Sequence, residues 1–149
     1  MAFREISVEE LKDNPFTLIN KDWMLITAGN REKHNTMTAS WGGVGELWGR
    51  YVSTIYIRPQ RYTLEFVERE DYYSLCFFGP EYRQALNLCG SKSGREIDKD
   101  AATGLTPCFD EAAPYYEQAR LVFLCRKLYR QDLEEGCFRT RAFWKSGTT

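Results

Sequence analysis

Histidine is scarce in this 149-residue chain, and closely spaced cysteine pairs are absent. The five cysteines are widely spaced and form no C-x-x-C pair, which argues against zinc and iron–sulfur centres. His34 is the only histidine, so a Ser-His-Asp or Cys-His arrangement could use only that residue, and no G-x-S-x-G segment accompanies it. These absences count against hydrolase chemistry and metal binding, and they predict free thiols that pack as small apolar side chains.

A strong charge of one sign and long apolar runs are absent as well. The formal net charge is -1, so no polycationic surface exists to attract nucleic acid or an anionic membrane. No apolar run is long enough to span a bilayer, and residues 1–6 lack the basic-then-apolar layout of a signal peptide. We therefore expect a cytoplasmic protein with neither nucleic acid nor membrane as a partner.

The glycine fingerprint of dinucleotide-binding folds is also missing. Gly43, Gly45 and Gly49 approach G-x-G-x-x-G, but the last glycine is one place late. A strand is expected after them, where the fingerprint needs a helix. We interpret these glycines as a flexible turn region, and a doubly wound nucleotide-binding fold is disfavoured.

The chain does have enough apolar residues, 43%, to form a core, and its length fits one domain over residues 1–149. β-Branched and aromatic residues between turn residues predict strands over 23–28, 35–41, 51–57 and 72–78, and a strand pair or one bent strand over 115–133. Short helices are expected over 62–69, 80–90 and 93–104. This order predicts a mainly β barrel with short inserted helices.

The strand expected over residues 35–41 has an unusual composition. Side chains alternate across a strand, so Thr36, Thr38 and Ser40 share one face. The other face carries Met37, Ala39 and Trp41, which suit a core. The three hydroxyls suit the polar edge of a ligand. An exposed strand with threonines chosen for their β propensity explains the pattern equally well.

Two further segments favour an anion. Arg58 and Arg61 can bind phosphate through bidentate forks, Pro59 suits the first position of a helix, and Thr63 adds a hydroxyl. A turn with solvated arginines is the alternative for this segment. Residues 90–95 combine small residues with two serines and two cations, and Lys99 follows one turn later. There, the alternative is that Ser93 only caps a helix.

The three segments together resemble one family. N-T-M-T-A-S-W, R-P-x-R-Y-T and G-S-K-S-G-R-x-x-D-K, in this order, are similar to the flavin reductase-like family with an FMN-binding split barrel, and the chain looks flavoredoxin-like over residues 23–133. The resemblance implies a homodimeric split β-barrel that holds FMN near the subunit interface. The residues it assigns to FMN are Asn35, Thr36, Met37, Thr38, Ala39, Ser40, Trp41, Arg58, Arg61, Tyr62, Thr63, Ser91, Ser93, Gly94 and Lys99.

Within this assignment, residues 35–41 would line the isoalloxazine ring through the backbone and the hydroxyls. The other two segments would surround the ribityl chain and phosphate. Family members similar to this chain continue past residues 135–138 with a closing strand that contains a Y-H segment. The present chain ends at Thr149 without one, so we expect the closing strand to be missing.

The resemblance also implies an oxidoreductase. NAD(P)H would pass hydride to FMN, and the reduced flavin would pass electrons to a small-molecule or protein acceptor. No acid–base side chain is strictly required, and no catalytic residue is assigned. One alternative is a non-enzymatic FMN-binding protein, which would serve as an electron carrier or as a redox or oxygen sensor. Another is a structural barrel that binds no flavin. His34 is interpreted as an exposed loop histidine, with a position facing the flavin or the nicotinamide as the alternative.

Overall fold

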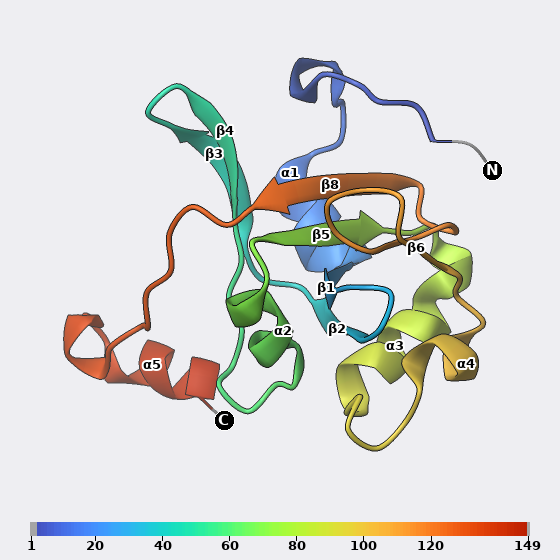
Figure 1. Cartoon of the computed structure of the whole chain (residues 1–149). Helices are drawn as coiled ribbons and strands as arrows, with labels where there is room; N and C mark the ends of the chain where they lie inside the picture. The colour runs from blue at the N-terminus through green and yellow to red at the C-terminus, as the bar shows by residue number, and fades with distance from the viewer. Residues whose placement is uncertain (1–2, 149) are drawn as a thin grey trace.

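The centre of the computed structural model, which describes residues 3–148, is a four-stranded antiparallel sheet (Figure 1). Its strand order is β2-β1-β5-β8, and the strands are β1 (Met24–Gly29), β2 (His34–Ala39), β5 (Tyr72–Phe77) and β8 (Leu121–Arg126). Every residue of β1 is buried, because neighbours cover both faces of this strand. Its sequence accordingly lacks the polar alternation of a half-exposed strand.

Each face of the sheet packs against a different set of helices. Ile26, Met37 and Leu75 lie opposite one another in register and pack with Phe66 of α2 (Thr63–Arg69). The opposite face packs against α3 (Arg83–Ser91), whose Leu86 and Cys89 are buried. Strand β2 therefore has one face towards the α2 side and the other towards α3.

The glycine-rich segment forms a strand rather than a flexible turn region. Strand β3 (Gly43–Leu47) pairs with β4 (Arg50–Thr54) in a hairpin that projects from the rest of the chain (Figure 1). The two residues of the turn, Trp48 and Gly49, both have positive φ, at 49° and 81°. This backbone suits the right-handed twist of a two-residue hairpin. The turn prediction holds for Gly49 but was wrong for Gly43 and Gly45, because cross-strand pairing with β4 sets their conformation.

The remaining elements are short. They are η1 (Val8–Glu10), α1 (Pro15–Thr17), the π-helix η2 (Leu18–Asp22), η3 (Pro80–Tyr82), α4 (Lys99–Thr103), β6 (Pro107–Cys108), β7 (Tyr115–Tyr116), η4 (Glu135–Cys137) and α5 (Arg141–Thr148). The helix expected from residue 93 begins only at Lys99, because Asp98 and not Ser93 caps it. None of the helices within residues 3–148 has the length and apolarity needed to cross a bilayer.

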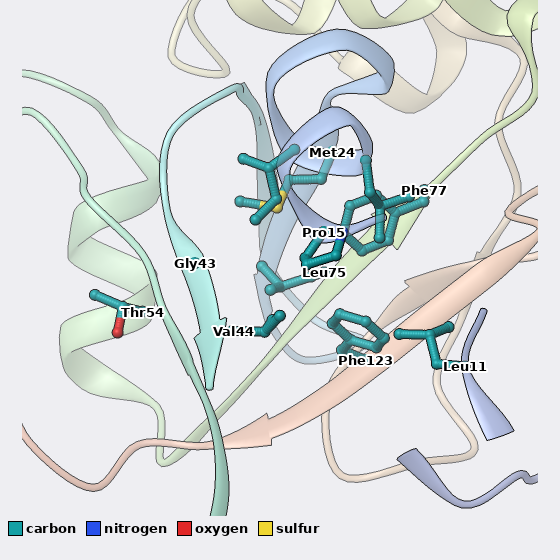
Figure 2. A pocket seen from close by; sticks show the side chains of 11 residues that line it. Leu11, Pro15, Met24, Gly43, Val44, Thr54, Leu75, Phe77 and Phe123 are labelled. Atoms are coloured by element: carbon teal, nitrogen blue, oxygen red, sulfur yellow. The ribbon is translucent and has the colours of Figure 1, made fainter. Parts of the chain in front are cut away.

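The space between the hairpin and the sheet is filled by apolar side chains. Figure 2 shows the cavity left there, which has a volume of about 10 Å³. Residues from the N-terminal segment, β1, the hairpin, β5 and β8 line it, among them Leu11, Met24, Val44 and Phe123. Such a volume holds about one water molecule. This cavity is therefore too small for a ligand larger than a water molecule.

Candidate functional site

A polar pocket of about 130 Å³ forms where the three predicted segments meet. Its walls come from β2, from the turn before α2, from the end of α3 with the loop that follows, and from α4. The lining residues are Asn35, Met37, Gln60, Arg61, Tyr62, Thr63, Ser91, Lys92, Ser93, Gly94 and Lys99. The structure thus brings together most of the residues that the sequence assigned to a ligand, although they lie far apart in the chain.

Arg61 carries a donor without a partner in this pocket. Its Nη1 donates to the backbone oxygen of Gly90 over 2.9 Å, while the buried Nη2 has no partner among the described residues. Burial lowers the pKa of Arg61, and the nearby charge of Arg58 lowers it further. A buried cationic donor without a partner is costly, so an anion in the pocket would relieve that cost.

Lys99 is the second cation, and the residue is only 6% exposed. The Nζ atom donates to the backbone oxygens of Thr36 over 2.6 Å and of Cys89 over 2.9 Å. Burial is the largest cause that lowers its pKa, to about 8; the charge of Arg61 acts in the same direction, and Cys89 opposes it. An ammonium group has three hydrogens, so one of them remains for a ligand.

The pocket contains no acidic side chain among the described residues that line it. At its edge, Arg95 pairs with Glu65 and lies 4.4 Å from the centre of the Tyr62 ring. Among the described residues, neither Arg61 nor Lys99 has a carboxylate partner. The chemistry of the pocket therefore favours an anionic group with several oxygen atoms.

Close packing fixes the loop on the other side of the pocket. The Nδ2 of Asn35 donates to the Thr63 hydroxyl over 2.8 Å, and both residues are buried. Gly94 lies so close to the Asn35 side chain that a Cβ atom at this position would overlap its carboxamide oxygen. Ser93 accepts a hydrogen bond from the backbone N–H of Arg95 over 3.1 Å, and its own hydroxyl hydrogen remains available to donate.

The hydroxyl-lined face of β2, which the sequence analysis assigned to the flavin ring, does not line this pocket. Thr36 is 1% exposed, and its hydroxyl bonds to the Thr27 hydroxyl and to the backbone oxygen of Ile26. The Thr38 hydroxyl donates to the backbone oxygen of Leu86 in α3. The opposite face of the strand, with Asn35 and Met37, lines the pocket. Alternation identified the two faces correctly but not which of them meets the pocket.

Four more of the assigned residues lie outside the pocket. Ala39 is buried in the core, and Ser40 and Trp41 follow the end of β2. Trp41 is exposed, and the guanidinium carbon of Arg58 lies 4.8 Å from the centre of its ring. The Nε of Arg58 is buried and has no hydrogen-bond partner within residues 3–148. Arg58 and Trp41 thus form a separate cation–π pair.

Two features escaped the sequence analysis. Gln60 lines the pocket, but a glutamine between arginines gives no distinctive signal. His34 is not an exposed loop residue, because it begins β2 and its Nε2 lies 2.6 Å from Asp100 Oδ2. That interpretation was wrong because the partner is 66 residues away in the sequence.

Comparison with known proteins identifies the family. A model of the flavin reductase like domain matches residues 17–136. The chain belongs to the flavin reductase-like family. No curated protein matches its sequence closely enough to count as a relative.

Solved structures show that this member of the flavin reductase-like family has the split-barrel fold expected from the sequence. Flavoredoxin of Desulfovibrio vulgaris (Miyazaki F) superposes with a TM-score of 0.67 at 20% identity, over 78% of this chain and 72% of that one. An FMN-binding domain of a flavin reductases-like enzyme from Shewanella baltica OS155 superposes with a TM-score of 0.66 at 18% identity. The match covers 78% of this chain and 62% of that one. A split barrel domain protein from Shewanella frigidimarina NCIMB 400 has a TM-score of 0.66 at 19% identity. The match covers 88% of this chain and 72% of that one.

The share of each solved protein that this chain matches ranges from 62% to 72%. The chain spans less than two thirds of the Shewanella baltica protein. Within residues 3–148 the strands form three separate sheets. At these identities the likeness establishes the fold, which confirms the predicted class.

Proposed function

We propose that the pocket binds the phosphate end of FMN. The observation that carries this proposal is that two cations, half-buried Arg61 and buried Lys99, share the pocket with no carboxylate partner among the described residues. Arg61 would donate through Nη2, Lys99 through its third hydrogen, and Ser93 through its hydroxyl. Membership of the flavin reductase-like family supports FMN as the molecule that carries the phosphate. The residues present fit this end of the cofactor.

The size of the pocket limits what it can hold. A volume of about 130 Å³ suits a phosphate with part of a polyol chain. A tricyclic ring needs more space and would lie outside this pocket. We propose that a second copy of the chain covers the flavin ring, in the homodimer that the resemblance implies.

The proposed activity is that of an NAD(P)H-dependent flavin reductase. Bound FMN would supply the redox chemistry by accepting hydride and passing electrons on to a small-molecule or protein acceptor. The chain would contribute binding and orientation, since Arg61 and Lys99 hold the anionic end in place. An electron carrier or redox or oxygen sensor would use the same binding site but would not oxidise the nicotinamide. Cytoplasm remains the predicted location.

Flavin binding can be tested directly by titration of the purified protein. FMN fluorescence should be quenched in a saturable way, and the protein should leave a gel filtration column yellow. Riboflavin, which lacks the phosphate, should bind at least about tenfold more weakly. A colourless protein without quenching would refute flavin binding, and equal affinity for riboflavin would refute the phosphate assignment.

The redox activity needs a separate measurement on the loaded protein. Oxidation of NADH or NADPH, followed by absorbance with an added flavin or quinone acceptor, would support the reductase. A yellow protein that oxidises neither nucleotide with any acceptor would instead support the carrier or sensor.

A further inference from the structure

Helix α4 is held in place by polar contacts and not by apolar packing. It has five residues, and Lys99 is the only one that is buried. An isolated helix of this length is unstable in water. Its position must therefore come from its caps and from the contacts that its side chains make with other elements.

Two consecutive residues make those contacts. Lys99 reaches the backbone oxygens of Thr36 in β2 and Cys89 in α3. Asp100 accepts a hydrogen bond from His34 Nε2 over 2.6 Å and another from the Tyr116 hydroxyl over 2.6 Å. The helix is thus attached to β2 through both residues, at positions two residues apart on that strand.

The partners of Asp100 hold its carboxylate firmly. Tyr116 is fully buried, while His34 and Asp100 have side chains that are 18% and 21% exposed. Burial acts to raise the pKa of Asp100, but the hydrogen bonds from His34 and Tyr116 outweigh it, and the pKa is lowered. The carboxylate is therefore ionised at neutral pH and accepts both bonds.

We propose that Asp100, held by His34 and Tyr116, is a positioning residue that keeps the Lys99 ammonium group in the anion pocket. The proposal rests on the proposed function, because it assigns Lys99 to the phosphate. Asp100 does not line the pocket. It acts by fixing the helix from which Lys99 extends.

The first experiment is a double-mutant cycle on FMN affinity. Asp100→Asn keeps the shape of the side chain but leaves one acceptor oxygen for two donors, and it should raise the FMN dissociation constant about fivefold or more. In a Lys99→Met background, the same substitution should change the constant less than about twofold, because the group that it positions is gone. An equal effect in both backgrounds would overturn the proposal.

Asp98→Asn is the matched control for this cycle. It removes a carboxylate from the same helix, but asparagine caps a helix as well as aspartate does. FMN affinity should stay at the wild-type value.

If Asp100→Asn does not fold, Tyr116→Phe removes one of the two donors and should act in the same direction with a smaller effect. Unchanged FMN affinity in Tyr116→Phe would then overturn the proposal.

A second measurement needs no flavin. Acetic anhydride should acetylate buried Lys99 slowly in the wild-type protein, relative to exposed Lys12, as measured by mass spectrometry. Asp100→Asn should raise the relative rate at Lys99 several-fold, and an unchanged rate would overturn the proposal. If the wild-type protein binds no FMN, the proposed function fails, whereas the labelling still reports whether Asp100 positions Lys99.

Discussion

Arg61 contributes a donor that is free to bind a ligand in the pocket, since its buried Nη2 has no partner in the described part of the chain. We expect Arg61→Ala to raise the FMN dissociation constant by about 10- to 100-fold, because charged hydrogen bonds contribute roughly 1.5–3 kcal/mol. Fluorescence titration measures this change. The fold should persist, since the substitution also removes a buried donor that lacked a partner.

The control for Arg61 is another arginine close by in the sequence. Arg69 at the end of α2 is exposed and lies over the Phe66 ring, outside the pocket. Arg69→Ala should leave FMN affinity unchanged. If Arg61→Ala also leaves it unchanged while far-ultraviolet circular dichroism shows a native fold, the phosphate lies elsewhere.

Lys99 gives the site a pH dependence whose sign can be derived. Its pKa in the free protein is about 8, and a bound anion favours the charged form and so raises it. Binding then takes up a proton above about pH 8, and FMN affinity should fall by up to about tenfold per pH unit. The FMN phosphate is already fully ionised there, because its second pKa is about 6.

Titrations between about pH 7 and about pH 9 measure this fall. Lys99→Arg is the comparison, since a guanidinium group remains charged throughout this range. Its profile should be flat. A wild-type profile that is equally flat would show that Lys99 does not sense the bound anion.

At the scale of elements, the loop between α3 and α4 depends on one close approach. A Cβ atom at residue 94 would overlap the Asn35 carboxamide, so Gly94→Ala must either shift that side chain and disturb its hydrogen bond to Thr63 or displace the loop. We expect a loss of about 1–3 kcal/mol in the free energy of unfolding, measured by urea denaturation, together with weaker FMN binding. Gly45→Ala in β3 is the control, because nothing lies within 4 Å of its Cβ position. Equal stability losses in the two variants would contradict this account.

The sequence placed most elements of the central sheet correctly. The strands expected over 23–28 and 72–78 agree with β1 and β5 to within one residue at each end, because runs of β-branched and aromatic residues between turn residues are local signals. The expected strand over 51–57 is shorter, ending at Thr54. The segment over 115–133 is divided into β7 and β8, because the backbone between them turns and leaves the ladder.

At the scale of the whole molecule, the hairpin of β3 and β4 exposes an unusual amount of apolar surface. Trp48 is 90% exposed, and Leu47 and Tyr51 are about half exposed. A monomer would leave these side chains in water, and such surfaces usually mark an interface. We expect light scattering after gel filtration to give twice the 17.4 kDa mass of one chain.

Variants of the hairpin test whether this surface joins the two copies. Leu47→Lys combined with Trp48→Ser should shift the protein towards the monomer and weaken FMN binding. Leu128→Lys places the same charge on another exposed leucine and should leave the mass unchanged. A wild-type protein that is monomeric at tens of micromolar would contradict the homodimer.

The sequence by itself determined the family, the strand-rich fold and the three polar segments, because each depends on residues that are neighbours in the chain. The tertiary structure alone decided which face of β2 meets the pocket. Both faces of that strand are covered, so the alternation of side chains could not distinguish them. It also decided that Lys99 and Arg61 share one pocket and that Asp100 meets His34. These contacts join residues that lie far apart in the chain, and only the packing of α3 and α4 against the sheet brings them within hydrogen-bonding distance.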